Sequence, residues 1–232
     1  MRLSPSVYFY PSSPGRGWDD EEINSNTIVI DGPEMIIIDP GLDRRWPELR
    51  ARITADGLAP DRLRLIIGTH GHPDHIEAAT AVSRECGAEM IISEREADFI
   101  EAEGGYFFAE SGGLKPPRPV RFLTAGELVF GGHVLEIYPT PGHSPGSICL
   151  HLPMEKLLVT GDLYFTGTIG GFDYPGGRAA DLYESVASLQ KLTDVETVVC
   201  GHGPAIVGRR EVLDNYRLLN EEIARKKAAG IL

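Results

Sequence analysis

Side chains that bind metal ions occur at four points of the chain, each in a glycine-containing turn that follows a short apolar run. The densest is Thr69-His70-Gly71-His72-Pro73-Asp74-His75, which holds three of the seven histidines in 232 residues. The other three turns are Pro141-Gly142-His143, Gly161-Asp162 and Gly201-His202-Gly203. Imidazole nitrogens and carboxylate oxygens are ligands of Zn²⁺ and similar borderline cations. We therefore expect the four turns to meet in one metal site.

The spacing within the first motif favours two metal positions. His70 and His72 lie two residues apart, so in an extended loop they point the same way and can share one ion. Asp74 and His75 follow as the chain turns into a helix, and they can face a second ion. Gly71, which lies between His70 and His72, suits a sharp turn.

The remaining turns complete both positions. His143 would give the first position three nitrogens, and His202 would give the second two nitrogens and one oxygen. Asp162 has a carboxylate that can bridge both ions. Two zinc ions about 3.5–4 Å apart can hold a hydroxide for hydrolysis. We expect His133 and His151 to be surface or structural residues.

Composition restricts the function classes. The net charge of −12 argues against binding to nucleic acid. No apolar run approaches the roughly 20 residues of a membrane span, and the N-terminus shows no export signal. Cys86, Cys149 and Cys200 are odd in number and lie in apolar elements, so we expect reduced, buried thiols and a cytoplasmic protein. We expect a small-molecule substrate and no membrane partner, and leave a homodimer open.

The order of elements predicts the fold class. We expect a hairpin over 26–39, strands at 63–68, 90–92, 119–123, 127–130, 133–138, 147–152, 156–160 and 195–200, and helices at 44–57, 75–86, 93–103, 181–192 and 209–228. Asp181 and Glu184 resemble a capping box. Two similar halves indicate two sheets face to face with helices outside. The prediction is a single α/β domain over 1–232, a four-layer αββα sandwich.

Two segments are candidates for the substrate pocket. Residues 104–118 are rich in glycine and proline and carry Tyr106, Phe107 and Phe108. We expect this segment to be either a lid over the site or a surface loop anchored by its own aromatic residues. Residues 163–178 begin with Tyr164 and Phe165. Tyr164 is a candidate catalytic residue that could donate a hydrogen bond to an oxyanion, whereas for Phe165 we favour core packing.

The motif set resembles that of the metallo-β-lactamase-fold hydrolase superfamily over about residues 24–205. The resemblance implies the αββα sandwich with a site at one edge of the sheets. It implies that His70, His72 and His143 hold one metal ion and that Asp74, His75 and His202 hold the other, with Asp162 as the bridge.

Gly161-Asp162-Leu163-Tyr164-Phe165 is similar to the glyoxalase II-like branch. We therefore expect a metal-dependent hydrolase in which two zinc ions hold the attacking hydroxide, with Asp74, Asp162 and Tyr164 as catalytic residues and a thioester or lactone as substrate. One alternative is a persulfide dioxygenase with a single iron on His70, His143 and Asp162. Others are β-lactamase or phosphodiesterase activity on the same site, and a non-catalytic metal-binding module.

Overall fold

Two six-stranded sheets pack face to face in this computed structural model, which describes residues 1–12, 24–110 and 115–230. The first sheet has the order β1-β2-β3-β4-β5-β6, with bounds Val7–Tyr10, Thr27–Ile30, Met35–Ile38, Leu63–Ile67, Glu89–Ser93 and Arg121–Leu123. Its β3, β4, β5 and β6 are parallel, and β1 and β2 join antiparallel.

The second sheet has the order β14-β13-β10-β9-β8-β7, with bounds Ile206–Val207, Thr197–Cys200, Leu157–Gly161, Ile148–Leu152, His133–Pro139 and Gly126–Phe130. Only the β10–β13 pair is parallel here. A small hairpin of β11 (Tyr164–Phe165) and β12 (Thr168–Ile169) follows β10.

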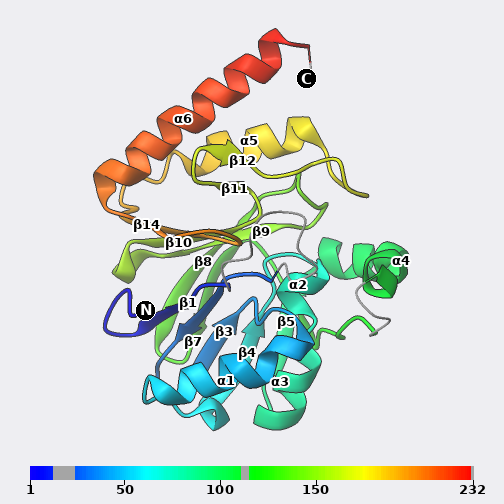
Figure 1. The fold of residues 1–232 in the computed structure, drawn as a ribbon, viewed down its shortest axis with the longest axis vertical. Helices are drawn as coiled ribbons and strands as arrows, with labels where there is room; N and C mark the ends of the chain where they lie inside the picture. Colours follow the sequence, from blue (N-terminus) through cyan, green and yellow to red (C-terminus); the bar gives the residue numbers. More distant parts are fainter. Residues whose placement is uncertain (13–23, 111–114, 231–232) are drawn as a thin grey trace.

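Helices cover the outer face of each sheet (Figure 1). On the first sheet lie α1 (Trp46–Ala55) and α3 (Ala79–Cys86), while α5 (Ala179–Leu189) and α6 (Arg209–Ala228) lie on the second. Two further helices are α2 (Pro73–Ile76) and α4 (Glu94–Glu110). No helix in the described ranges combines the length and apolarity that a membrane crossing demands.

The hydrophobic core forms three layers because strand side chains alternate between faces. In β3, Ile36 and Ile38 point into the layer between the sheets. Met35 and Ile37 point into the layer beneath α1 and α3. A third layer lies between the second sheet and the helices α5 and α6. The predicted αββα sandwich is confirmed.

Three predictions of local structure are wrong. The chain remains helical to Glu110 in α4, so residues 104–110 are not a loop. The side chain of Phe108 is buried in the layer beneath the first sheet, on the same helix face as Ile100, and this packing outweighs the helix-breaking tendency of Gly104 and Gly105. Residues 111–114 and the side chains of Tyr106 and Phe107 lie outside the described part.

The other two errors concern helix starts. The predicted helix over 75–86 is interrupted between α2 and α3, where the backbone N–H of Ala78 donates to the carbonyl oxygen of Gly41. Asp181 is not an N-cap, because α5 begins at Ala179 after Arg178. Asp181 instead lies 3.5 Å from the Arg178 guanidinium in the first turn.

Candidate metal centre

The ligand-bearing turns converge at one end of the two sheets. β4 ends at Ile67, and His70 and His72 follow it before Pro73 begins α2, which places Asp74 and His75 in a helical turn. His143 lies in the turn between β8 and β9, Asp162 directly follows β10, and His202 follows β13. The structure brings together all seven ligands predicted from the sequence.

Three imidazole rings form the first position. The Nε2 atoms of His70 and His143 lie 3.1 and 3.0 Å from Nδ1 of His72. All three rings are buried. The position therefore offers three nitrogen ligands aimed at a common point.

The second position combines two imidazoles with a carboxylate. Oδ2 of Asp74 lies 3.2 Å from Nε2 of His202 and 3.7 Å from Nε2 of His75. Asp162 faces both positions, because its Oδ1 lies 3.3 Å from Nε2 of His75 while its Oδ2 lies 3.4 Å from His202 and 3.8 Å from His143. Asp162 is thus placed to bridge.

Asp39, which the sequence analysis missed, sets the proton positions on two of the histidines. Its Oδ2 lies 2.8 Å from Nδ1 of His75 and accepts the Thr69 hydroxyl at 2.7 Å, while its Oδ1 accepts the Thr69 N–H at 2.8 Å. With its hydrogen committed to Asp39, the Thr69 oxygen accepts from Nδ1 of His70 at 3.1 Å. Both rings therefore carry their proton on Nδ1 and present a lone pair on Nε2 to the centre.

The donor set fits a pair of metal ions. Nδ1 of His143 donates to the carbonyl oxygen of Gly171 at 2.7 Å, so this ring also turns an Nε2 lone pair inward. Nε2 of His75 and Oδ1 of Asp162 are buried and make no hydrogen bond within the described residues. Imidazole and carboxylate ligand atoms gathered in a buried site are the arrangement that a metal cation stabilises.

The electrostatics differ between the positions. Burial, followed by the neighbouring histidines, lowers the pKa of His70 well below its ordinary range, and burial lowers that of His72 to about 3. At the second position burial also disfavours the charged ring, but the Asp162 and Asp74 carboxylates outweigh it and raise the pKa of His202 to about 10. The second position thus concentrates the negative charge.

Close packing explains a glycine at one turn. A Cβ atom on Gly201 would lie 1.9 Å from Oδ1 of Asp162 and 2.7 Å from Cε1 of His75. Glycine therefore lets the backbone after β13 pass directly behind the bridging carboxylate.

Tyr164 is not placed as expected, whereas Phe165 packs in the core as predicted. The Tyr164 side chain has no exposed surface and its ring contacts Tyr216 in the layer beneath α6, away from the ligand rings. This placement does not support a pocket-lining or oxyanion role for Tyr164. Phe165 lies closer to the centre, with its ring centroid 6.0 Å from that of His202.

Tyr174 is the tyrosine at the mouth of the centre, and the sequence analysis did not single it out for the site. Its ring centroid lies 5.7 Å from that of His72 and 5.9 Å from that of His143, and half of the residue is exposed. Its position in the glycine-rich stretch after the bridging aspartate was the available signal.

The other two histidines lie outside the centre, as predicted. Nε2 of His133 lies 2.9 Å from the carbonyl oxygen of Asp31. His151 is buried rather than on the surface, with Nδ1 3.0 Å from Glu136 and Nε2 3.6 Å from Asp194.

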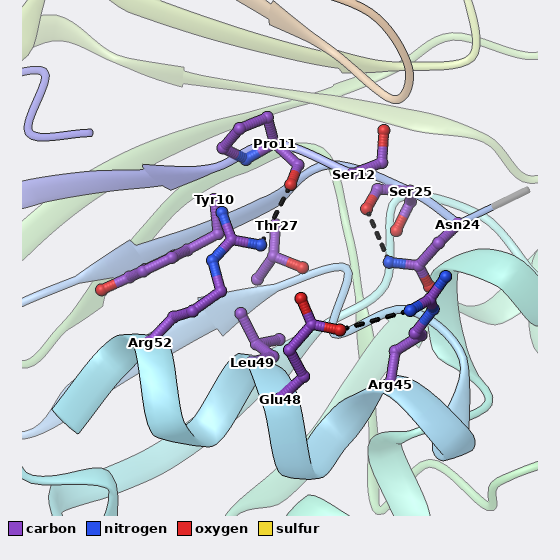
Figure 2. Close-up of a pocket in the computed structure, with 10 residues that line it drawn as sticks. All are labelled: Tyr10, Pro11, Ser12, Asn24, Ser25, Thr27, Arg45, Glu48, Leu49 and Arg52. Atoms are coloured by element: carbon purple, nitrogen blue, oxygen red, sulfur yellow. Dashed lines mark hydrogen bonds and ion pairs between the residues drawn. The ribbon is translucent and has the colours of Figure 1, made fainter. Parts of the chain in front are cut away.

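A small pocket lies between α1 and the strands β1 and β2 (Figure 2). Its wall at Ser25 is joined to the metal centre, because the N–H of Ser25 donates to the carbonyl oxygen of Asp74. Its charged side chains have partners in the pocket wall, because Arg45 lies 3.2 Å from Glu48 and Arg52 donates to the carbonyl oxygen of Pro11. We assign this pocket no chemistry.

Comparisons with known proteins agree with this centre. Residues 20–202 match the model of the metallo-beta-lactamase superfamily. A probable metallo-hydrolase of Methanocaldococcus jannaschii is 30% identical over 78% of this chain and 88% of its own. A hydroxyacylglutathione hydrolase, GloC, of Haemophilus influenzae is 32% identical over 78% and 85%. The crystal structure of TTHA1623 in a di-iron-bound form is 29% identical, with a TM-score of 0.70 over 85% of this chain and 94% of that one.

Proposed function

Because this chain belongs to the metallo-β-lactamase superfamily and is a metal-dependent hydrolase, we propose that it cleaves a small ester-type bond, a thioester or a lactone, with two divalent ions held by the seven ligands. Zinc is our proposed metal, with iron as the alternative that the di-iron form of a related structure brings forward. The observation that carries the proposal is the convergence of all seven ligands in overlapping groups of three at one site.

Two such ions would supply Lewis acidity and would lower the pKa of a water molecule, so that hydroxide is available at neutral pH. The protein would supply orientation. Asp162 would keep the two positions at a set separation. Asp74, whose side chain is 21% exposed compared with 10% for Asp162, lies on the more open side, where its carboxylate would accept a hydrogen bond from the attacking water and orient it.

The choice of an ester-type bond rests on the relatives and on the mouth of the centre. Hydroxyacylglutathione is a thioester, and hydrolases of this compound are among the related proteins. The exposed Tyr174 ring stands beside His72 and His143, where it would contact an acyl group of the substrate.

A substrate panel with parallel metal analysis tests this function. Protein purified without chelator would be assayed on a hydroxyacyl thioester, an acyl-homoserine lactone, a phosphodiester and a chromogenic β-lactam, with oxygen uptake on a persulfide in parallel. We expect two metal ions per chain and turnover of a thioester or lactone. One iron per chain, with oxygen consumed in step with the persulfide and no ester turnover, would establish the dioxygenase instead.

Asp162→Ala supplies the site-directed arm of the same experiment. Loss of the bridge should abolish hydrolysis, whereas Asp98→Ala, an exposed aspartate on α4, should leave it unchanged. Full activity in Asp162→Ala would refute the two-metal mechanism. A cytoplasmic location remains part of the proposal, supported by three free, buried cysteines, and cell fractionation would test it.

A further inference from the structure

Glu96 is a buried carboxylate that joins the two loops of the first metal position. It has no exposed surface. Its Oε1 accepts the N–H of Gly71 at 2.8 Å, and its Oε2 accepts the Ser144 hydroxyl and the Gly146 N–H, each at 2.8 Å. Gly71 stands between His70 and His72, and Ser144 directly follows His143.

The local sequence alone would assign this glutamate another role. Ser93 is three residues before Glu96, which is the spacing of a capping box at the start of α4. The Ser93 hydroxyl does receive the backbone N–H of Glu96 at 3.2 Å. The Glu96 carboxylate, however, directs both of its oxygens to the two ligand loops.

The glycines of both loops permit this close approach. A Cβ atom on Gly146 would lie 2.2 Å from the backbone nitrogen of Glu96. A Cβ atom on Gly71 would lie 2.6 Å from Ile100 of α4 and 3.0 Å from Oε1 of Glu96. Both loops are therefore seated directly on the first two turns of α4.

We infer that Glu96 is the positioning residue of the first metal position: it holds the loop of His70 and His72 and the loop of His143 in register with each other. This inference rests on the proposed metal centre. Three hydrogen bonds offset the free energy needed to bury a carboxylate. The second position is oriented differently, since Asp39 holds His75, α2 carries Asp74, and the turns after β10 and β13 bring its other ligands.

The inference predicts an asymmetric effect on metal binding. In Glu96→Gln one amide oxygen can still accept from one loop, but the amide NH₂ would face a donor of the other loop. Loss of such an outer hydrogen bond lowers metal affinity by about 10- to 100-fold. We expect this loss at the first position and less than a twofold change at the second.

Stepwise titration with Co²⁺, followed by its absorption spectrum, measures both affinities. His143→Ala and His202→Ala each disable one position and so assign the two binding steps. Glu101→Gln is the matched control, since it makes the same chemical change at an exposed site of the same helix. Thermal unfolding of the metal-free proteins measures how far each variant is destabilised. The ratio of the two affinities then reports site geometry, because that ratio does not depend on the folded fraction.

The outcomes are distinct. A selective weakening of the first position in Glu96→Gln, with Glu101→Gln unchanged, supports the inference. Equal weakening of both positions, or an unchanged ratio of affinities in a destabilised variant, overturns it. Two metal ions bound normally by Glu96→Gln would overturn this inference alone, whereas no metal binding by the unaltered protein would overturn the proposed function.

Discussion

Asp39→Asn should disturb both metal positions at once, through proton positions rather than through lost ligands. The backbone N–H of Thr69 is a fixed donor to Oδ1 of Asp39, so the asparagine must keep its carbonyl oxygen there. Its NH₂ group then occupies the place of Oδ2, which accepts from the Thr69 hydroxyl and from His75.

A donor at that place reverses two tautomers. Nδ1 of His75 would have to accept, which moves its proton to Nε2 and blocks that nitrogen as a ligand. The Thr69 hydroxyl would turn to accept from the new amide and donate to Nδ1 of His70, with the same result for that ring. Changes of this kind lower metal affinity by about 10- to 100-fold, or about 1.4–2.7 kcal/mol, for each position.

Competition with a chromophoric chelator would measure both affinities in Asp39→Asn and in Asp98→Asn, which makes the same change at an exposed site. We expect both steps to weaken in the first variant and neither in the second. Asp39→Asn with both affinities within twofold of the unaltered protein would refute the tautomer argument. Weakening of only the His75 position would refute the relay through Thr69.

Three further predictions follow from individual contacts. Gly201→Ala should lower kcat/KM at least about 100-fold, because its Cβ would displace Asp162; normal kinetics in a folded variant would contradict this. Tyr174→Ala should raise KM several-fold with little change in kcat, while Tyr174→Phe keeps the ring contacts and should behave normally; equal kcat losses in both would argue for a chemical role. The hydrogen bonds from His151 and Tyr138 lower the pKa of Glu136. The stability that ionised Glu136 contributes to the fold is therefore present above its ordinary pKa of 4.5 and is lost as pH falls through the lowered pKa. The stability difference between metal-free unaltered protein and Glu136→Gln, about 1 kcal/mol or less for this partly exposed group, should therefore shrink at acid pH in denaturant titrations, and a difference that grows there would contradict the assignment.

Much of the metal centre could be predicted because its ligands are encoded locally. His70, His72, Asp74 and His75 stand within one short motif after a strand, and strand ends that lie side by side bring their turns together. His143, Asp162 and His202 each follow a strand of the second sheet. The alternation of β3 side chains between two core layers follows from the geometry of the strand itself.

The residues that orient the ligands could not be found in this way, because their role depends on contacts across the fold. Asp39 follows β3 and reaches Thr69 and His75 from an adjacent parallel strand. Glu96 carries a helix-start signature, and only the packing of two loops against α4 turns its carboxylate toward them.

Tertiary packing also decided which aromatic residues are near the centre. Tyr164 and Phe165 are adjacent in β11 and must point in different directions. Both side chains are nonetheless buried in the layer beneath α5 and α6, and only the fold shows that Tyr164 packs against Tyr216 whereas Phe165 lies nearer the ring of His202. Likewise Gly104 and Gly105 disfavour a helix by about 1 kcal/mol each, yet α4 continues because Ile100 and Phe108 bury the same face. Local patterns determined where the ligands stand along the chain, and long-range packing determined what surrounds them.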